Sequence, residues 1–212
     1  MLQLNRGILI AIEGIDGSGK STIAANICNT LCNKGFSTLL TKEPGDSELG
    51  IYIRELVQTQ KIPITAKAQY LLFAADRAQH FNERVIPALQ ENKIVISDRL
   101  SDSSLAYQGY GNGLDCETIM DINQWSMNNI PIDLTIFVRI SVEKAIERCY
   151  QRGRLSAYER KDFLQKVADG FEQLYKNRSN SIIIDGTQSP ENLTINLCNA
   201  IIQWIQSNAI LL

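Results

Sequence analysis

Short apolar runs recur along the chain, and longer stretches between them repeat apolar residues every three or four positions. The runs are typical of buried strands, and the spaced pattern is typical of helices with one buried face. The predicted strands cover residues 7–12, 36–41, 94–98, 134–140 and 181–185. The predicted helices cover residues 19–33, 48–59, 66–91, 101–110, 115–128, 142–152, 159–176 and 190–207, with the third bent or interrupted before Pro87. Strands and helices that alternate in this way predict an α/β fold with three layers, a five-stranded parallel sheet covered by helices on both faces.

Composition limits the classes of protein that the chain can belong to. Apolar residues make up 44% of it, enough for a continuous core, and the formal net charge is -2 with no basic tail or stripe. That balance argues against a nucleic-acid partner. No apolar run reaches the ~18–20 residues of a membrane span, and the opening residues are too polar for a signal peptide. We therefore expect a cytoplasmic protein that forms a single domain over residues 1–212, with no membrane partner and a short lid at about 148–160.

The cysteines do not suggest a metal site. There are five, none of them in a C-x-x-C arrangement, and the chain has a single histidine. A zinc site is therefore not expected, and the cysteines should be reduced thiols.

Residues 14–21 read Gly-Ile-Asp-Gly-Ser-Gly-Lys-Ser and fit the phosphate-binding pattern G-x-x-x-x-G-K-[ST]. They join the first predicted strand to the first predicted helix, which is the context that this loop requires. Unpaired N–H groups and the positive end of the helix dipole favour an anion there. We expect Lys20 to reach the β- and γ-phosphates of a nucleotide and the Ser21 hydroxyl to bind Mg²⁺.

Two further polar clusters follow the second and third predicted strands, where open α/β sheets bind their ligands. Residues 42–45 read Lys-Glu-Pro-Gly, and Asp98-Arg99 ends the third strand. Asp98 is a candidate for holding Mg²⁺, directly or through water, and Arg99 for clamping a phosphate with two hydrogen bonds. The alternative for this pair is a helix cap and a surface ion pair.

Phe73 and Arg77 lie four residues apart, so they share a helix face. A ring there offers a stacking surface for a base, and a guanidinium offers donors to a base carbonyl. The structural alternative is that Phe73 packs in the core while Arg77 is a solvated partner of Asp76. Both interpretations remain open from the pattern alone.

Arg148, Arg152 and Arg154 surround Gly153 near the end of a predicted helix. They either belong to a mobile lid that places cations on a transferring phosphoryl group, or they are favoured there by the helix dipole.

Several segments, in the same order along the chain, resemble the thymidylate kinase family. They are residues 13–21, 43–45, 72–80, 98–99, 103–109, 131–135 and 184–190, and the likeness runs from about residue 7 to 205. The phosphate loop alone is unspecific, whereas the ordered set is highly specific. The resemblance implies the P-loop NTPase fold and the Mg²⁺-dependent transfer of the γ-phosphoryl group of ATP to dTMP, giving dTDP and ADP on the way to dTTP. It also implies a homodimer.

The resemblance implies a set of residues for the acceptor dTMP. Phe73 stacks on thymine, Arg77 bonds its O4, Ser104 lies near its N3, and Gln108 lies in the same pocket. Tyr107 crowds the sugar C2′, which favours deoxyribose.

The remaining implied roles concern the phosphates and the donor. Asp16 takes the 3′-hydroxyl, while Arg99 and the turn at Glu43 and Pro44 hold the dTMP phosphate. The residues implied in binding ATP are Gly14, Ile15, Asp16, Gly17, Ser18, Gly19, Lys20, Ser21, Thr22, Thr187 and Gln188, and the implied catalytic cations are Lys20, Arg99, Arg152 and Arg154.

The chain departs from the family pattern at a few positions. Lys42 stands where the family commonly has Arg, and Asp46 where it has a second Gly. Ala157 stands in place of a lid arginine, which makes Arg154 the nearest replacement. Arg139 stands where the family often has Asp, and the sequence offers no account of that change.

Two other functions remain possible at this point. One is another P-loop nucleotide or deoxynucleoside kinase, in which Glu43 would serve as the base at a 5′-hydroxyl, although the phosphate clamp at Arg99 argues for a monophosphate. The other is a GTP-dependent switch or a nucleotide-binding module with a weakened lid. The chain lacks the N-K-x-D stretch that recognises guanine.

Overall fold

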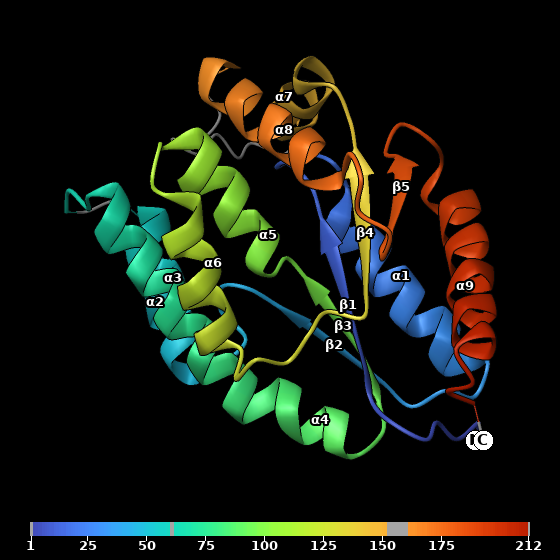
Figure 1. Ribbon diagram of the computed structural model, residues 1–212. Helices are drawn as coiled ribbons and strands as arrows, with labels where there is room; N and C mark the ends of the chain where they lie inside the picture. The colour runs from blue at the N-terminus through green and yellow to red at the C-terminus, as the bar shows by residue number, and fades with distance from the viewer. Residues whose placement is uncertain (1, 60–61, 152–160, 212) are drawn as a thin grey trace.

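The computed structural model describes residues 2–59, 62–151 and 161–211. In this part of the chain five strands form one parallel sheet in the order β2-β3-β1-β4-β5. The strands are β1 (Ile8–Glu13), β2 (Thr38–Lys42), β3 (Ile94–Asp98), β4 (Leu134–Arg139) and β5 (Ser181–Asp185). Helices cover both faces of the sheet (Figure 1). The predicted three-layer α/β fold is confirmed.

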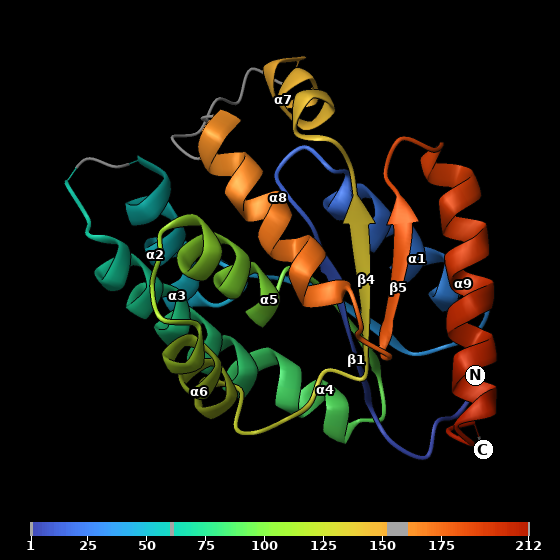
Figure 2. The same ribbon diagram turned by 45° about the horizontal axis from the view of Figure 1, so that its top comes forward.

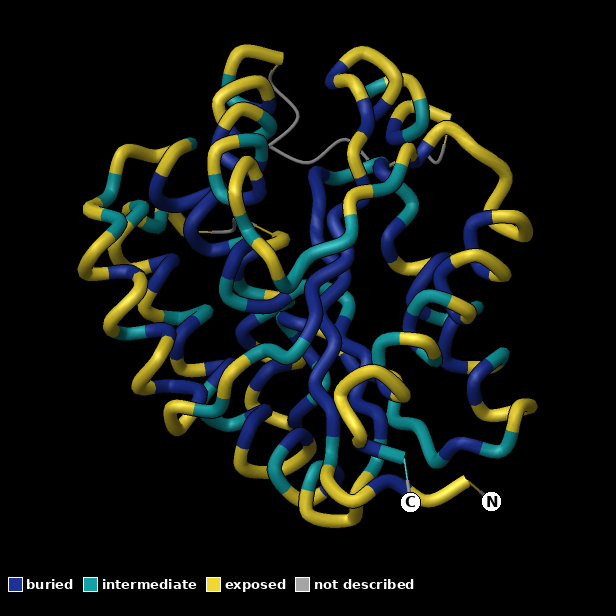
Figure 3. The backbone as a smooth tube through the Cα atoms, turned by 45° about the vertical axis from the view of Figure 1, so that its right-hand side comes forward, coloured by how far each residue is buried: buried dark blue, intermediate teal, exposed yellow. Residues whose placement is uncertain are grey.

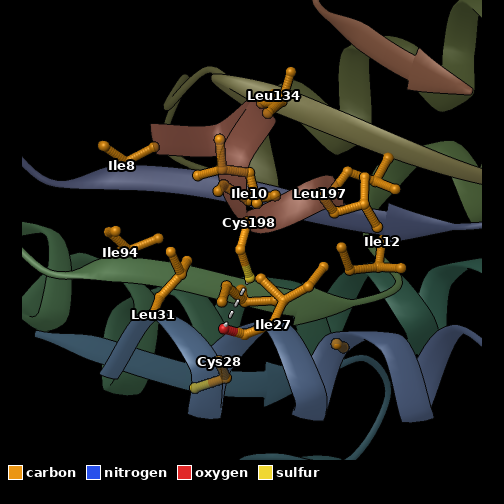
Figure 4. Packing of buried hydrophobic residues seen from close by; sticks show 14 of the residues in the cluster. Ile8, Ile10, Ile12, Ile27, Cys28, Leu31, Ile94, Leu134, Leu197 and Cys198 are labelled. Carbon is orange, nitrogen blue, oxygen red and sulfur yellow. Dashed lines mark hydrogen bonds between the residues drawn. The ribbon is translucent and has the colours of Figure 1, made fainter. Parts of the chain in front are cut away.

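One face of the sheet is covered by α1 (Lys20–Asn33) and α9 (Pro190–Ser207), which lie side by side (Figure 1). Ile8, Ile10 and Ile12 of β1 point toward these helices because alternate residues of a strand share a face. Figure 4 shows this core, in which the β1 side chains meet Ile27 and Leu31 of α1 and Leu197 and Cys198 of α9. Figure 3 shows buried strands at the centre and exposed residues on the outer sides of the helices.

Leu9 and Ala11 of β1 point to the opposite face, where they pack against a long helical segment. That segment consists of α3 (Ala66–His80), a π-helical turn η1 (Phe81–Val85) and α4 (Ile86–Gln90). It corresponds to the helix predicted over 66–91. Pro87 cannot donate to the carbonyl four residues before it, and the wider π turn accommodates this loss.

The other elements also follow the predicted order, with small shifts at their ends. They are α2 (Glu48–Thr59), α5 (Ser101–Ser104) continued by a π-helical turn η2 (Leu105–Gly111), α6 (Cys116–Ser126), α7 (Val142–Gln151) and α8 (Lys161–Tyr175). Figure 2 shows α2, α3 and α6 together at one side of the sheet and α9 at the other.

A third core joins α7 and α8 to the sheet and to η2. Phe137 of β4 stacks with Phe171 and Tyr175 of α8, at ring-centre distances of 5.5 and 4.7 Å. This packing fixes α8 above the carboxyl end of β4. Within the described residues, no helix combines the length and apolar character needed to cross a membrane.

Candidate active site

The strand register brings the three polar segments together at one edge of the sheet. Asp98 at the end of β3 lies opposite Ile12 of β1 on one side and Lys42 of β2 on the other. The phosphate loop, the segment after β2 and the pair Asp98-Arg99 therefore begin on adjacent strands. This is the edge at which the sequence predicted a site.

The phosphate loop turns tightly between β1 and α1. Gly17 and Gly19 have positive φ angles of 84° and 102°, which only glycine adopts without strain. A Cβ on Gly17 would also lie 2.3 Å from the Ala145 carbonyl oxygen. Lys20 is buried, and its Nζ donates to the Ile15 carbonyl at 2.8 Å. The ammonium is thus folded back along the loop.

The surroundings of Lys20 make it less basic than an exposed lysine. Burial is the main cause, and the positive charge of Arg99 adds to it, so the pKa of Lys20 falls to about 8. A phosphate bound in the loop would add negative charge and restore the ammonium.

Ser21 and Asp98 meet beside the loop. The Ser21 hydroxyl donates to Asp98 Oδ2 at 2.5 Å, while Asp98 Oδ1 is buried and has no hydrogen-bond partner among the described residues. In the same described part, no group of three or more His, Cys, Asp or Glu side chains gathers as a metal cage. A hydroxyl and one carboxylate suit Mg²⁺, which takes few protein ligands and completes its shell with water and phosphate oxygens. The residues fit the predicted metal, and a pocket of about 230 Å³ opens beside them, lined by Ser21, Leu40, Thr41, Lys42, Asp46 and Asp98.

Arg99 lies between the loop and the helix α5. Its Nη1 donates to the Gly14 carbonyl at 3.2 Å and to Ser103 Oγ at 2.8 Å. Its Nη2 donates to Asp16 Oδ1 at 2.5 Å and to the Tyr107 hydroxyl at 3.4 Å. The surface ion pair considered for Asp98 and Arg99 is therefore wrong, since the partner of Arg99 is Asp16.

Asp16 is held in its ionised form by this arrangement. Burial opposes the charge, but the cations of Arg99 and Lys20 outweigh it and lower the pKa of Asp16 to about 2. Tyr107 donates to Asp16 Oδ2 at 3.0 Å, and its own hydroxyl accepts from the Asp16 backbone N–H at 3.0 Å. Burial, and then the Asp16 charge, raise the pKa of Tyr107, so this phenol remains a donor.

Arg77 occupies a second buried position, on α3. Its Nε donates to Glu43 Oε2 at 2.8 Å, its Nη2 donates to Ser104 Oγ at 3.1 Å, and its Nη1 donates to Asn123. Only 2% of the side chain is exposed. The structural alternative of a solvated Arg77 paired with Asp76 is therefore wrong.

Glu43 is occupied on both carboxylate oxygens. Arg77 takes Oε2, and His80 Nδ1 lies 3.0 Å from Oε1, while His80 Nε2 lies 2.5 Å from Thr41 Oγ1. Burial opposes ionisation of Glu43, but Arg77 and His80 outweigh it and lower the pKa of this carboxyl. A carboxylate bound in this way is poorly placed to serve as the base of a nucleoside kinase.

Side chains from two helices form hydrogen bonds with the turn after Glu43. Asp76 of α3 accepts from the Gly45 N–H at 3.2 Å, and Arg54 of α2 donates to the Pro44 carbonyl at 2.8 Å. The turn that was predicted to face the dTMP phosphate is thereby fixed to α2 and α3.

The remaining predicted residues lie around these centres. Gln108 is buried in η2, in the same helical segment as Ser104, and Phe73 is half-buried on α3. Thr187 and Gln188 are exposed after β5, and Gly186 beside them lies so close to the loop that its Cβ would be 3.0 Å from the Ser18 carbonyl oxygen. The predictions for Arg152, Arg154 and Ala157 lie outside the described residues.

Sequence reasoning missed several side chains of this site. His80 lies three residues after Arg77 and so shares its helix face, a signal that was present in the sequence. Asn123 accepts hydrogen bonds from both Arg77 and the Tyr70 hydroxyl. It lies on α6, far from both residues along the chain, so no sequence pattern indicated this contact. Arg148 was noted, and its Nη1 lies 3.3 Å from the Ser18 carbonyl oxygen of the loop.

The unexplained Arg139 has a structural account. Its Nε and Nη2 donate to the two carboxylate oxygens of Glu172 on α8, at 2.7 and 2.6 Å. Both side chains are about half exposed, so Arg139 forms a surface ion pair between β4 and α8.

Comparison with known proteins identifies the family of this chain. A model of the thymidylate kinase family matches residues 12–196. The thymidylate kinase of Halothermothrix orenii is 39% identical over 193 residues, which cover 89% of this chain and 93% of that protein. The thymidylate kinase of Carboxydothermus hydrogenoformans is 39% identical over 190 residues, with shares of 89% and 93%. A crystal structure of thymidylate kinase from Ehrlichia chaffeensis matches with a TM-score of 0.76 and 28% identity, covering 92% of this chain and 98% of that one. Family model, relatives and fold agree, and the chain belongs to the thymidylate kinase family.

Proposed function

We propose that the chain transfers the γ-phosphoryl group of ATP to dTMP at the edge of the sheet formed by β2, β3 and β1. One observation carries this proposal: Lys20 begins the helix that follows β1, Arg99 follows the adjacent strand β3, and Asp16 of the phosphate loop is bonded to Arg99. A phosphoryl transfer enzyme acts mainly by bringing two phosphates together and neutralising their charge. Family membership supports the choice of ATP and dTMP.

The base of dTMP binds between α3 and the helical segment 101–111. Arg77 donates to the thymine O4, and Ser104 and Gln108 face its polar edge. Phe73 provides the stacking surface. Glu43, Asn123 and Ser104 each receive one N–H of Arg77, and a guanidinium has five, so two donors remain for the base.

The sugar of dTMP lies over Tyr107 and Asp16. The Tyr107 ring packs against Phe163 and Phe171, at ring-centre distances of 6.3 and 6.4 Å, so it is held rigidly. A ring fixed in this way leaves no room for a 2′-hydroxyl. Asp16 is ionised and accepts the 3′-hydroxyl.

The phosphate of dTMP lies between Arg99 and the turn at Glu43 and Pro44. The four N–H bonds on Nη1 and Nη2 of Arg99 have four acceptors, which belong to Gly14, Ser103, Asp16 and Tyr107. Binding of dTMP exchanges some of these contacts for phosphate oxygens, and Asp16 is released toward the sugar.

ATP binds on the other side of the loop. Its phosphates take the N–H groups of residues 14–22 and the ammonium of Lys20, while Thr187 and Gln188 border the adenine. Mg²⁺ would be held by Ser21 and Asp98 and would neutralise charge on the phosphates. Lys20 and Arg99, with Arg152 and Arg154 of a lid at about 148–160, supply the cations that stabilise the transferring group.

We further propose that the chain forms a cytoplasmic homodimer of single-domain subunits through the side that α2, α3 and α6 form. Neighbouring helices of this side expose large apolar side chains, which monomeric surfaces rarely gather. They are Leu49, Ile51 and Tyr52 on α2, Leu71 on α3, and Met120 and Trp125 on α6. Trp125 is 77% exposed.

An acceptor panel tests the activity. ADP release is measured with ATP and Mg²⁺ and with dTMP, dUMP, UMP, CMP, AMP or thymidine as acceptor. The proposal predicts the highest kcat/KM for dTMP, weaker use of dUMP and no turnover of thymidine. Preference for thymidine would indicate a nucleoside kinase with Glu43 as base, and ADP release independent of every acceptor would indicate an ATPase.

A further inference from the structure

A buried carboxylate lies next to the phosphate loop but outside it. Glu13 is the last residue of β1, and none of its side chain is exposed. Its Oε1 accepts from the Leu100 N–H at 2.8 Å and from the Ser103 N–H at 3.2 Å. Its Oε2 accepts from the Ser103 hydroxyl at 2.5 Å. All these contacts go to the start of α5, on a segment almost ninety residues away in sequence.

The Glu13 carboxylate caps the N-terminus of α5. The N-cap residue of α5 is Leu100, whose apolar side chain cannot accept a hydrogen bond from the first N–H groups of the helix. The first N–H groups of a helix need acceptors, and Glu13 supplies one from the neighbouring strand. The helical segment that begins there carries Ser104, Tyr107 and Gln108, which line the proposed dTMP site.

The same carboxylate reaches Arg99 through one hydroxyl. Ser103 Oγ donates to Glu13 and accepts from Arg99 Nη1 at 2.8 Å. The backbone of Arg99 has a φ angle of 73°, a left-handed conformation that is uncommon outside glycine and needs support from its surroundings. The Leu100 N–H that Glu13 holds belongs to the residue that follows this turn.

We propose that Glu13 is a positioning residue for dTMP binding, which sets the direction of the Arg99 guanidinium through Ser103 and the first turn of α5. Because Glu13 directly precedes Gly14, the same residue joins the donor loop to the acceptor clamp. This inference rests on the proposed role of Arg99 as the clamp of the dTMP phosphate.

The charge environment of Glu13 is consistent with a role beyond packing. Burial and the nearby charge of Asp102 raise the pKa of Glu13 to about 7, against the hydrogen bonds from Ser103 and Leu100 and the attraction of Arg99. Asp102, on the same turn, is itself bound by the Tyr175 hydroxyl at 2.6 Å and by Arg178 Nη1 at 2.5 Å. Replacing Glu13 by an apolar residue would leave the Leu100 and Ser103 N–H groups without their acceptor, which is costly in a buried site. The informative variant is therefore Glu13→Gln, which keeps the shape and one acceptor oxygen but loses the charge and the acceptor for the Ser103 hydroxyl.

The test is a double-mutant cycle on kcat and on the KM values for dTMP and ATP. At pH 8, above the raised pKa of Glu13, Glu13→Gln should raise KM for dTMP about ten- to hundredfold, the effect of losing one charge-assisted contact. KM for ATP should stay within about threefold because Lys20 is untouched. In the Arg99→Lys background the same change should add less than about threefold, because residues that act through one another are not additive. Thr135→Val, a buried change on the adjacent strand β4, serves as the matched control and should leave both KM values unchanged.

The outcomes separate this inference from the proposed function. Two results would overturn the positioning role alone. One is a double variant whose increase in KM for dTMP equals the product of the increases in Glu13→Gln and Arg99→Lys. The other is a Glu13→Gln enzyme whose KM values for dTMP and ATP rise equally. An Arg99→Lys enzyme with the parent KM for dTMP would overturn the clamp and this inference together. If Glu13→Gln does not fold, Ser103→Ala decides: it should raise KM for dTMP about three- to tenfold, and a value within twofold of the parent would reject the relay.

Discussion

Arg99 reaches from the end of β3 to Asp16 in the phosphate loop, and its Nη2 lies 2.5 Å from Asp16 Oδ1. The residue proposed to clamp the acceptor is thus already bonded to the loop proposed to hold the donor. Because one partner is a guanidinium with a fixed fork of donors, the contact sets direction as well as distance. We expect substrate binding at this site to exchange these partners of Arg99 for phosphate oxygens of dTMP.

Lys20→Ala should abolish transfer with little loss of fold. The ammonium interacts most strongly with the charge that develops on the transferring group, so kcat should fall by roughly 10²–10³ or more. Steady-state kinetics and a thermal melt on the same preparation check both parts. Turnover within a few-fold of the parent would remove Lys20 from this role.

Binding of ATP to the free enzyme should weaken at high pH. The pKa of Lys20 is lowered to about 8 by burial and by Arg99, so the side chain is charged below that pH and neutral above it. Only the charged form attracts phosphate, so Kd for ATP should rise as the pH passes through about 8. Titrations at pH 7 and pH 9 measure this, and Lys20→Met should show no such step.

Tyr107→Ala should relax the preference for deoxyribose. The ring proposed to crowd C2′ is held by Phe163 and Phe171, and its loss would open space for a 2′-hydroxyl. The ratio of kcat/KM for dUMP to that for UMP measures the discrimination. Tyr107→Phe is the matched control because it keeps the ring, and an unchanged ratio in Tyr107→Ala would exclude the steric role.

Glu43→Gln should destabilise the fold in a pH-dependent way. Burial opposes the ionisation of Glu43, and the stronger attraction of Arg77 and His80 lowers its pKa below the usual 4.5. Its contribution to stability is therefore present above pH 4.5 and is lost as the pH falls through the lowered pKa. At pH 7 the variant leaves a buried Arg77 without its counter-charge, a loss of about 3–5 kcal/mol in the free energy of unfolding.

Denaturant unfolding at pH 7 and pH 3 measures this effect. The difference between parent and Glu43→Gln should shrink at the lower pH. Glu172→Gln, which breaks the exposed pair with Arg139, should change stability by less than about 1 kcal/mol at pH 7. Equal losses in the two variants would contradict the special position of Glu43.

The sequence predicted where the five strands lie along the chain and that helices connect them, because buried parallel strands are continuous apolar runs. Their order in the sheet came only from the structure. It also predicted the phosphate loop, Arg99 and Arg77 as polar groups at strand and helix ends. It could not predict the partners of these groups. Asn123 meets Arg77 and Glu13 meets Ser103 only because α6 and β1 pack beside segments distant in sequence. Arg139 is explained by Glu172 for the same reason.

Arg152→Ala and Arg154→Ala should each lower kcat with a modest change in KM for dTMP. Cations that act on the transferring group are worth roughly 10²–10⁵ in rate, and Arg152, which matches the family position, should have the larger effect. Ala157→Arg should partly rescue Arg154→Ala. Steady-state kinetics of these variants decide the matter, and near-parent activity of Arg154→Ala would show that it has not replaced the missing arginine.

The central claim is that the γ-phosphoryl group moves directly from ATP on the loop to the phosphate of dTMP clamped by Arg99. Incubation with ATP labelled at the γ position, followed by separation of the nucleotides, tests it most directly. The account predicts label in dTDP for the parent chain, almost none for Lys20→Ala, and a slower gain at subsaturating dTMP for Arg99→Lys. Label that appears in inorganic phosphate instead of dTDP, or transfer to dTMP that is unchanged in both variants, would contradict it.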